Sequence, residues 1–169
     1  VRLFGENRVQ EAKIKFENLK TKYTNLELHL TGPLQRNKVK EAIRIFDVFH
    51  TLDREKLAKE FIKSEGIENK KFFIQVNTGN EANKSGILIE EIKSFTNFCK
   101  KDLGLNIVGL MCIPPINEEA KQHFAILANE ARKNNLIQLS IGMSNDYKEA
   151  IKCDAAYIRI GTSLFGKRL

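Results

Sequence analysis

Hydrophobic residues along this chain fall into two alternating patterns. Short runs of apolar and β-branched residues predict buried strands, whereas longer stretches in which apolar residues recur every three or four positions predict amphipathic helices. The expected strands cover residues 2–5, 26–30, 48–52, 72–76, 105–111, 138–141 and 155–160. A helical segment is expected after each of these strands.

The helix after the first strand has the clearest pattern. Its apolar positions, separated by charged residues, are Val9, Ala12, Phe16, Leu19 and Tyr23. We expect all of these side chains to face the core, because their spacing places them on one side of a helix. Asp53 follows the third strand and is expected to cap the next helix.

Glycine and hydroxyl residues follow each of the last two strands. Gly142 is followed by Ser144, and Gly161 is followed by Thr162 and Ser163. Glycine allows backbone N–H groups to approach an oxyanion closely, and a Ser or Thr hydroxyl both binds the anion and caps the following helix. These two junctions predict a phosphate site, although the same residues also suit tight strand-to-helix turns.

The uninterrupted alternation of strand and helix predicts parallel strands, either in a barrel or in an open doubly wound sheet. No G-x-G-x-x-G turn follows the first strand, and the candidate phosphate residues follow the last two, which favours a TIM-type (β/α)8 barrel. We expect one barrel domain over residues 1–169 that lacks its first strand and helix, since the chain opens on Val1. Residues 2–5 and 155–160 would then be unpaired edges, which makes the chain prone to aggregation.

Composition narrows the possible functions. The chain is 42% hydrophobic with no run near the ~18 apolar residues that span a membrane, so we expect a cytoplasmic protein, most simply a monomer. Cys99, Cys112 and Cys153 lie far apart and only three histidines are present, so neither disulfides nor a metal site are expected.

The net charge of +7 raises the alternative of a nucleic-acid-binding module. The lysines are, however, spread over every expected helix, and no basic motif interleaved with aromatic residues occurs. A solvated, lysine-rich surface accounts for the charge better, and no nucleic-acid partner is expected.

Eight segments, in order along nearly the whole chain, carry a family resemblance: FGEN at 4–7, HLTGPLQRNK at 29–38, HTLD at 50–53, QVN at 75–77, KSG at 84–86, GLM at 109–111, SIGMS at 140–144 and RIGT at 159–162. On these segments the chain resembles the pyridoxal phosphate homeostasis protein family, single-domain relatives of the alanine racemase N-terminal barrel. The resemblance implies a non-catalytic protein that binds pyridoxal 5′-phosphate (PLP), buffers it and helps supply PLP-dependent apoenzymes. The alternative is a racemase-like or other phosphate-binding barrel enzyme. A racemase of the related kind uses a tyrosine base from a second, β-rich domain, which these residues do not supply.

The resemblance also implies roles for individual residues. It places Ser144, Gly161 and Thr162 at the cofactor phosphate, with Gly142 and Met143 beside them. Arg159 would lie beside the pyridine nitrogen and Asn7 near the cofactor. Because arginine only donates hydrogen bonds, it would keep that nitrogen unprotonated and the ring a poor electron sink. This suits a carrier better than a transaminase-like catalyst, although the related racemases also use an arginine at this place.

Each of three residues has an alternative role. The alternative for Arg159 is a strand residue paired with a carboxylate of the barrel, and the alternative for Asn7 is a helix cap. His29 could face either the barrel interior or the outer layer.

The family's Schiff-base lysine lies in a segment of the A-V-S-K-x-x-P type before FGEN, and no such segment occurs in these residues. Lys84, in the polar loop 77–86, is the candidate substitute, with a solvated loop lysine as the alternative.

We therefore expect this 169-residue chain to bind PLP weakly and without covalent attachment, because phosphate hydrogen bonds contribute only about 0.5–3 kcal/mol each in water. Absorbance titration, borohydride reduction and peptide mapping test this expectation. Stoichiometric trapping of the cofactor at one lysine, such as Lys84, would contradict it.

Overall fold

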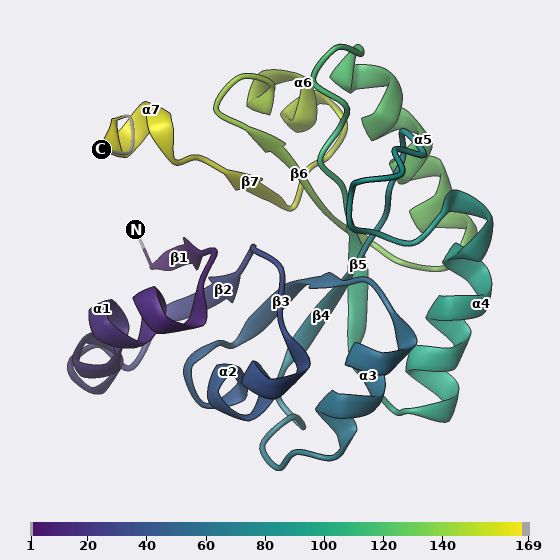
Figure 1. The fold of residues 1–169 in the computed structure, drawn as a ribbon. Coiled ribbons are helices and arrows are strands. Elements are labelled where there is room, and N and C mark those ends of the chain that lie inside the picture. The colour runs from purple at the N-terminus through teal and green to yellow at the C-terminus, as the bar shows by residue number, and fades with distance from the viewer. Residues whose placement is uncertain (1, 167–169) are drawn as a thin grey trace.

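The computed structural model describes residues 2–166, and the strands in this range form a single parallel sheet. Its seven strands pair in chain order: β1 (Leu3–Glu6), β2 (Glu27–Leu30), β3 (Val48–Leu52), β4 (Lys71–Gln75), β5 (Ile107–Met111), β6 (Gln138–Met143) and β7 (Tyr157–Arg159). The sheet curls into a nearly closed barrel, and β1 and β7 are its two edges (Figure 1). The expected barrel-type fold and edge strands are therefore confirmed.

Helices surround the strands on the outside (Figure 1). The α-helices in residues 2–166 are α1 (Val9–Lys22), α2 (Val39–Ile45), α3 (Glu55–Ile62), α4 (Ile92–Asn97), α5 (Ala120–Lys133), α6 (Tyr147–Lys152) and α7 (Thr162–Phe165). Shorter helical turns cover Arg36–Lys38, Ile89–Glu91 and Phe98–Asp102. Within the described range, every helix is too short or too polar to cross a membrane.

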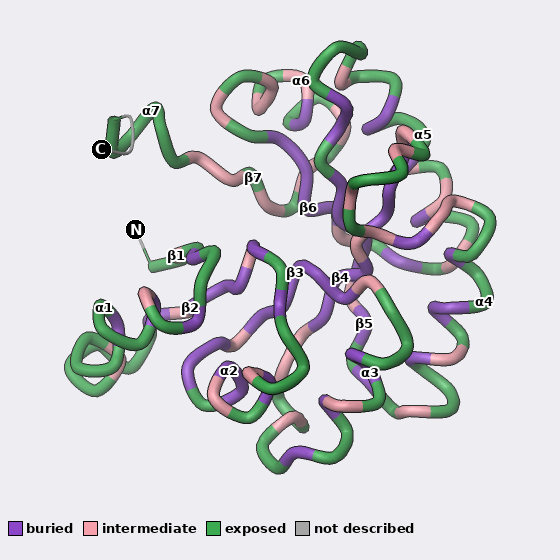
Figure 2. Tube along the Cα trace, viewed as in Figure 1, coloured by how far each residue is buried: buried purple, intermediate pink, exposed green. Residues whose placement is uncertain are grey.

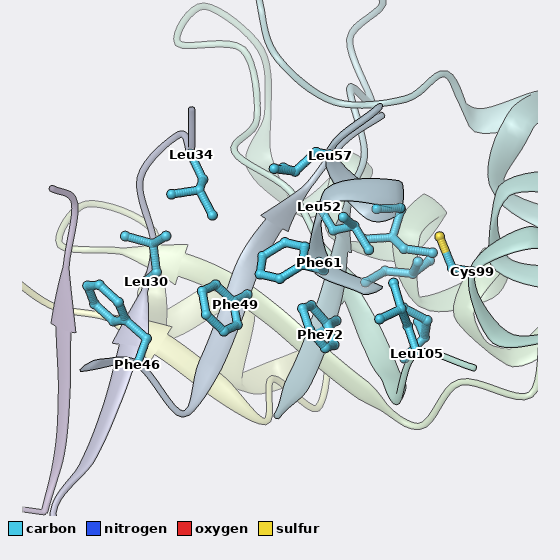
Figure 3. Packing of buried hydrophobic residues seen from close by; sticks show 14 of the residues in the cluster. Leu30, Leu34, Phe46, Phe49, Leu52, Leu57, Phe61, Phe72, Cys99 and Leu105 are labelled. Atoms are coloured by element: carbon cyan, nitrogen blue, oxygen red, sulfur yellow. The ribbon is translucent and has the colours of Figure 1, made fainter. Parts of the chain in front are cut away.

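The larger hydrophobic core lies between the strands and the outer helices. Successive strand residues point to opposite faces, so Phe49 on β3 and Phe72 on β4 both point outward. Their rings stack with centroids 5.4 Å apart, and Phe61 of α3 packs edge-on against both at 4.8 Å (Figure 3). These aromatic contacts attach α3 to the middle of the sheet.

The inner face of the sheet has its own, smaller core. Val48, Phe73 and Met111 form a buried cluster in the barrel interior, with Tyr157 of β7 packed against it. The strands in the middle of the sheet are therefore buried on both faces, as is usual for parallel strands. Figure 2 shows the same trend, with burial concentrated on the middle strands and more exposure along β7 and α7.

Two expectations about the helices are wrong. Leu19 and Tyr23 are 38% and 42% exposed rather than buried, because α1 lies over the edge strand β1 and packs against one neighbouring helix, α2. Asp53 does not cap α3, since Arg54 occupies the cap position and the Asp53 carboxylate pairs with the Arg54 side chain.

Phe72→Ala should lower the free energy of unfolding by about 3–5 kcal/mol, because it leaves a cavity within the aromatic cluster. Ile14→Ala is the matched control, since Ile14 lies on α1 with 85% of its surface exposed. Urea denaturation followed by circular dichroism measures both variants. Equal losses in the two variants would show that the aromatic cluster is not the main core.

Candidate functional site

Near its carboxyl end, β6 has a left-handed backbone conformation at Gly142. This residue has a φ of 88°, and a Cβ atom there would lie 2.5 Å from the Ala150 Cβ and 3.1 Å from the Tyr147 Cα of α6. The register between β6 and β7 also shifts between Ser140 and Met143. Glycine is therefore required here, because it alone allows β6 to pass this close to α6.

The two glycine–hydroxyl junctions contact one another. The backbone N–H of Ser163 donates a 3.4 Å hydrogen bond to Ser144 Oγ, which links the turn after β6 to the start of α7. Gly161 lies at the cap position of α7, and apart from Gly161 and its two chain neighbours no atom within residues 2–166 lies within 4 Å of where its Cβ would be. Thr162 follows as the first residue of α7 and is exposed. The structure thus brings Gly142, Met143, Ser144, Gly161 and Thr162 together at one end of the barrel.

The expectation that Ser144 caps the next helix is wrong. The helix α6 begins only at Tyr147, and Asp146 occupies its cap position. The Asp146 carboxylate accepts a 2.5 Å hydrogen bond from the Met143 backbone N–H instead. Ser144 Oγ consequently stays in the turn, where it meets α7.

Arg159, the last residue of β7, directs its guanidinium into the barrel. Nη1 donates to the Ser140 backbone oxygen and to Ser140 Oγ, both at 2.7 Å, and Nη2 donates to the Cys112 backbone oxygen at 2.9 Å. Burial lowers the pKa of Arg159 from its ordinary value. Within residues 2–166 no carboxylate forms an ion pair with this guanidinium. The alternative that Arg159 pairs with a carboxylate of the barrel is therefore wrong.

Two histidines face the barrel interior beside this arginine. His29 Nδ1 lies 2.8 Å from His50 Nε2, and His50 Nδ1 lies 2.7 Å from Ser140 Oγ. His29 Nε2 in turn lies 2.9 Å from a carboxylate oxygen of Glu27. Burial lowers the pKa of His29, against the opposing effect of Glu27, and lowers the pKa of His50 well below its ordinary value.

Sequence reasoning placed His29 on either face of the sheet and gave His50 and Ser140 no role. These residues could have been recognised as hydrogen-bonded to one another because they are polar residues on buried strands, and a buried polar side chain needs a hydrogen-bond partner. His50 also stacks on Phe73, with ring centroids 4.6 Å apart, which fixes its ring plane.

Within residues 2–166, the side chains of Asn7 and Lys84 make their hydrogen bonds to residues outside the two junctions. Asn7 follows β1, and its Oδ1 accepts a 2.9 Å hydrogen bond from Oγ1 of Thr31, which follows β2. Arg8, not Asn7, occupies the cap position of α1. Lys84 Nζ lies 2.6 Å from Glu81 Oε2 and donates to the Pro114 backbone oxygen at 3.2 Å. Both side chains are thus engaged by neighbouring loops.

The geometry defines what this end of the barrel can bind. The junctions offer a serine hydroxyl, a threonine hydroxyl and the start of α7 around an open space at Gly161, an arrangement that suits an oxyanion. Arg159 adds a partly buried cation that can only donate hydrogen bonds. Among residues 2–166, no group of three or more His, Cys, Asp or Glu side chains is placed to hold a metal ion.

Comparison with known proteins gives consistent matches over almost the whole chain. A family model described as "Alanine racemase, N-terminal domain" matches residues 1–168. A protein of Aquifex aeolicus named "Pyridoxal phosphate homeostasis protein" is 38% identical over 179 residues, which cover 99% of this chain and 78% of that protein.

Two solved structures of PipY from Synechococcus elongatus also match, each covering 98% of this chain and 82% of PipY. The structure without PLP has a TM-score of 0.89 and 34% identity, and the structure with PLP bound has a TM-score of 0.82 and 32% identity.

The buried histidines predict that acid destabilises the fold. As pH falls below about 6.5, a histidine of the unfolded chain binds a proton that neutral, buried His50 does not, so the free energy of unfolding falls by up to about 1.4 kcal/mol per pH unit for each such histidine. His50→Gln should reduce this slope. Urea denaturation between pH 5 and 8 measures it; above pH 7 the histidine contribution should be constant, and an unchanged slope in His50→Gln would contradict the account.

Proposed function

The chain belongs to the pyridoxal phosphate homeostasis proteins of the alanine racemase N-terminal domain family, and on this premise we propose that it binds PLP where β6 and β7 end. The proposed role is that of a cofactor carrier or buffer in vitamin B6 homeostasis. The relatives' name and the PLP-bound structure of PipY support this cofactor.

The observation that carries the proposal is the hydrogen bond between Ser163 and Ser144. It holds the two junctions side by side, so that hydroxyl and backbone donors from both can surround one phosphate group. Nothing within residues 2–166 fills the space beside Gly161, where a side chain would otherwise stand. The residues present therefore fit a phosphate, with Gly142, Met143, Ser144, Gly161 and Thr162 as its proposed surroundings.

Arg159 favours a carrier over a transaminase-like catalyst. When bound, PLP supplies an aldehyde and a ring that accepts electrons well only while its nitrogen is protonated. A guanidinium beside that nitrogen donates a hydrogen bond to it. Because arginine stays protonated at neutral pH, it does not transfer its proton to the ring nitrogen, and the unprotonated ring is favoured. We propose Arg159 as the residue at the ring nitrogen, and Asn7, which follows the other edge strand, β1, as a further contact.

The exposure of the proposed phosphate site supports a role in passing PLP on to other proteins. Gly161 and Thr162 are exposed, whereas the Arg159 guanidinium is directed inward onto Ser140 and Cys112. A ligand held this way keeps its phosphate end accessible to solvent. We propose PLP-dependent apoenzymes as the recipients of the released cofactor.

Thr162→Leu should weaken PLP binding about tenfold or more, since a lost hydrogen bond to a charged group costs about 1.5–3 kcal/mol. The matched control is Thr21→Leu, because Thr21 is an exposed threonine on α1 whose hydroxyl bonds only to the Asn18 backbone oxygen within residues 2–166. Isothermal titration calorimetry with PLP, and separately with inorganic phosphate, measures both variants. Equal affinities in Thr162→Leu and the native chain would exclude this phosphate site.

A further inference from the structure

A continuous series of hydrogen bonds crosses the barrel interior from β2 to β7. It joins the side chains of Glu27, His29, His50, Ser140 and Arg159, with neighbouring polar atoms 2.7 to 2.9 Å apart. These residues come from four strands, and Ser140 is separated from His50 by 90 positions in the sequence. We call this series the interior relay.

The two ends of the interior relay determine its direction. The Glu27 carboxylate only accepts hydrogen bonds, and the Arg159 guanidinium only donates them. With His29 neutral, its Nε2–H must donate to Glu27, which leaves Nδ1 to accept from His50 Nε2–H. His50 Nδ1 then accepts a hydrogen bond from the Ser140 hydroxyl, and Ser140 Oγ accepts a hydrogen bond from Arg159.

Every donor of the interior relay therefore points from Arg159 toward Glu27. The reverse assignment of neutral histidines would place two acceptors, His29 Nε2 and the Glu27 carboxylate, against each other at 2.9 Å. Burial of both rings favours their neutral forms. Two aromatic rings hold the imidazoles in place. Phe73 stacks on His50, and the ring centroids of Tyr157 and His29 are 5.0 Å apart.

The direction has a consequence at Arg159. Because the Ser140 hydroxyl donates its hydrogen bond to His50 Nδ1, Ser140 Oγ offers only lone pairs to the guanidinium. Three of the five N–H groups that an arginine carries are engaged by Ser140 and Cys112. The remaining N–H groups, on Nη2 and Nε, have no partner within residues 2–166 and are free to donate to a ligand.

We propose that Ser140 and His50 are positioning residues, which act through Arg159 to select a ligand ring with an unprotonated, hydrogen-bond-accepting nitrogen. This inference rests on the proposed function. Glu27 and His29 complete the device, because they fix the tautomer of His50 and thereby the direction of the Ser140 hydroxyl. The selected chemical class is a phosphorylated pyridine rather than any phosphate ester.

The first experiment needs no ligand. Long-range ¹H–¹⁵N NMR spectra of the native chain at neutral pH should show both His29 and His50 as neutral Nε2–H tautomers. A His50 that carries its proton on Nδ1 would reverse the hydrogen bond to Ser140 and overturn the proposal. This result does not depend on whether PLP is the ligand.

The second experiment compares PLP with its 1-deaza analogue, in which a C–H group replaces the ring nitrogen. The native chain should prefer PLP, and Ser140→Ala should reduce that preference about fivefold, as expected for one hydrogen bond of about 1 kcal/mol. Affinity for inorganic phosphate should not change in Ser140→Ala. Ser64→Ala is the control, since Ser64 is a buried serine at the end of α3 whose hydroxyl bonds to the Glu60 backbone oxygen.

The outcomes separate the two proposals. If the native chain binds neither PLP nor phosphate, the proposed function fails, and the selection of a pyridine ring fails with it. If the native chain binds PLP but Ser140→Ala keeps the full preference over the deaza analogue, only the positioning role is overturned. Circular dichroism verifies that the variant folds, and the tautomer measurement on the native chain decides the matter if it does not.

Discussion

Burial on both faces of the middle strands is the constraint on which this structure depends. The outer face is filled by aromatic and aliphatic side chains that hold the helices, such as Phe49, Phe61 and Phe72. The inner face also carries polar side chains, and polar groups buried there are costly unless each has a hydrogen-bond partner. The interior relay satisfies this requirement, and it does so by connecting the middle of the barrel to the end where β6 and β7 offer their glycine–hydroxyl junctions.

The partly buried guanidinium of Arg159 and the exposed junctions have complementary physical roles. Arg159 is fixed from behind by Ser140 and the Cys112 backbone oxygen, so its remaining donors present a constant pattern to a ligand. Thr162 and Gly161 lie at the open edge of the sheet, where solvent reaches them. A ligand bound between them would be recognised by the rigid interior and released through the exposed end, which is consistent with a carrier.

Much of the fold could be predicted from the sequence because it depends on local patterns. Alternating short apolar runs and helical spacings gave the strand order, the edge strands and the position of both glycine junctions. The predictions from sequence were wrong where burial or capping depends on residues that are close in space but not in the local pattern. Leu19 and Tyr23 have the spacing of a buried face, but α1 lies over an edge strand, so little covers its last turns. Ser144 has the right residue type for a cap, but Asp146 is better placed at the start of α6.

The interior relay could not be predicted for the same reason. Its central contact joins His50 to Ser140, and these residues meet only because the sheet curls until β3 faces β6 across the interior. Neither residue belongs to a local motif with an evident chemistry. Periodicity could assign them to the inner face of their strands, but only the closure of the barrel determines which polar partner each one finds.

Amide NMR during a titration tests the central claim, that one ligand contacts both junctions and Arg159, most directly. Adding PLP to the ¹⁵N-labelled chain should shift the backbone signals of residues 142–144 and 161–163 together with the Arg159 Nε–H signal. Pyridoxal, which lacks the phosphate, should leave the junction signals nearly unchanged. Shifts confined to the loop around Lys84, or equal shifts with both compounds, would contradict the account.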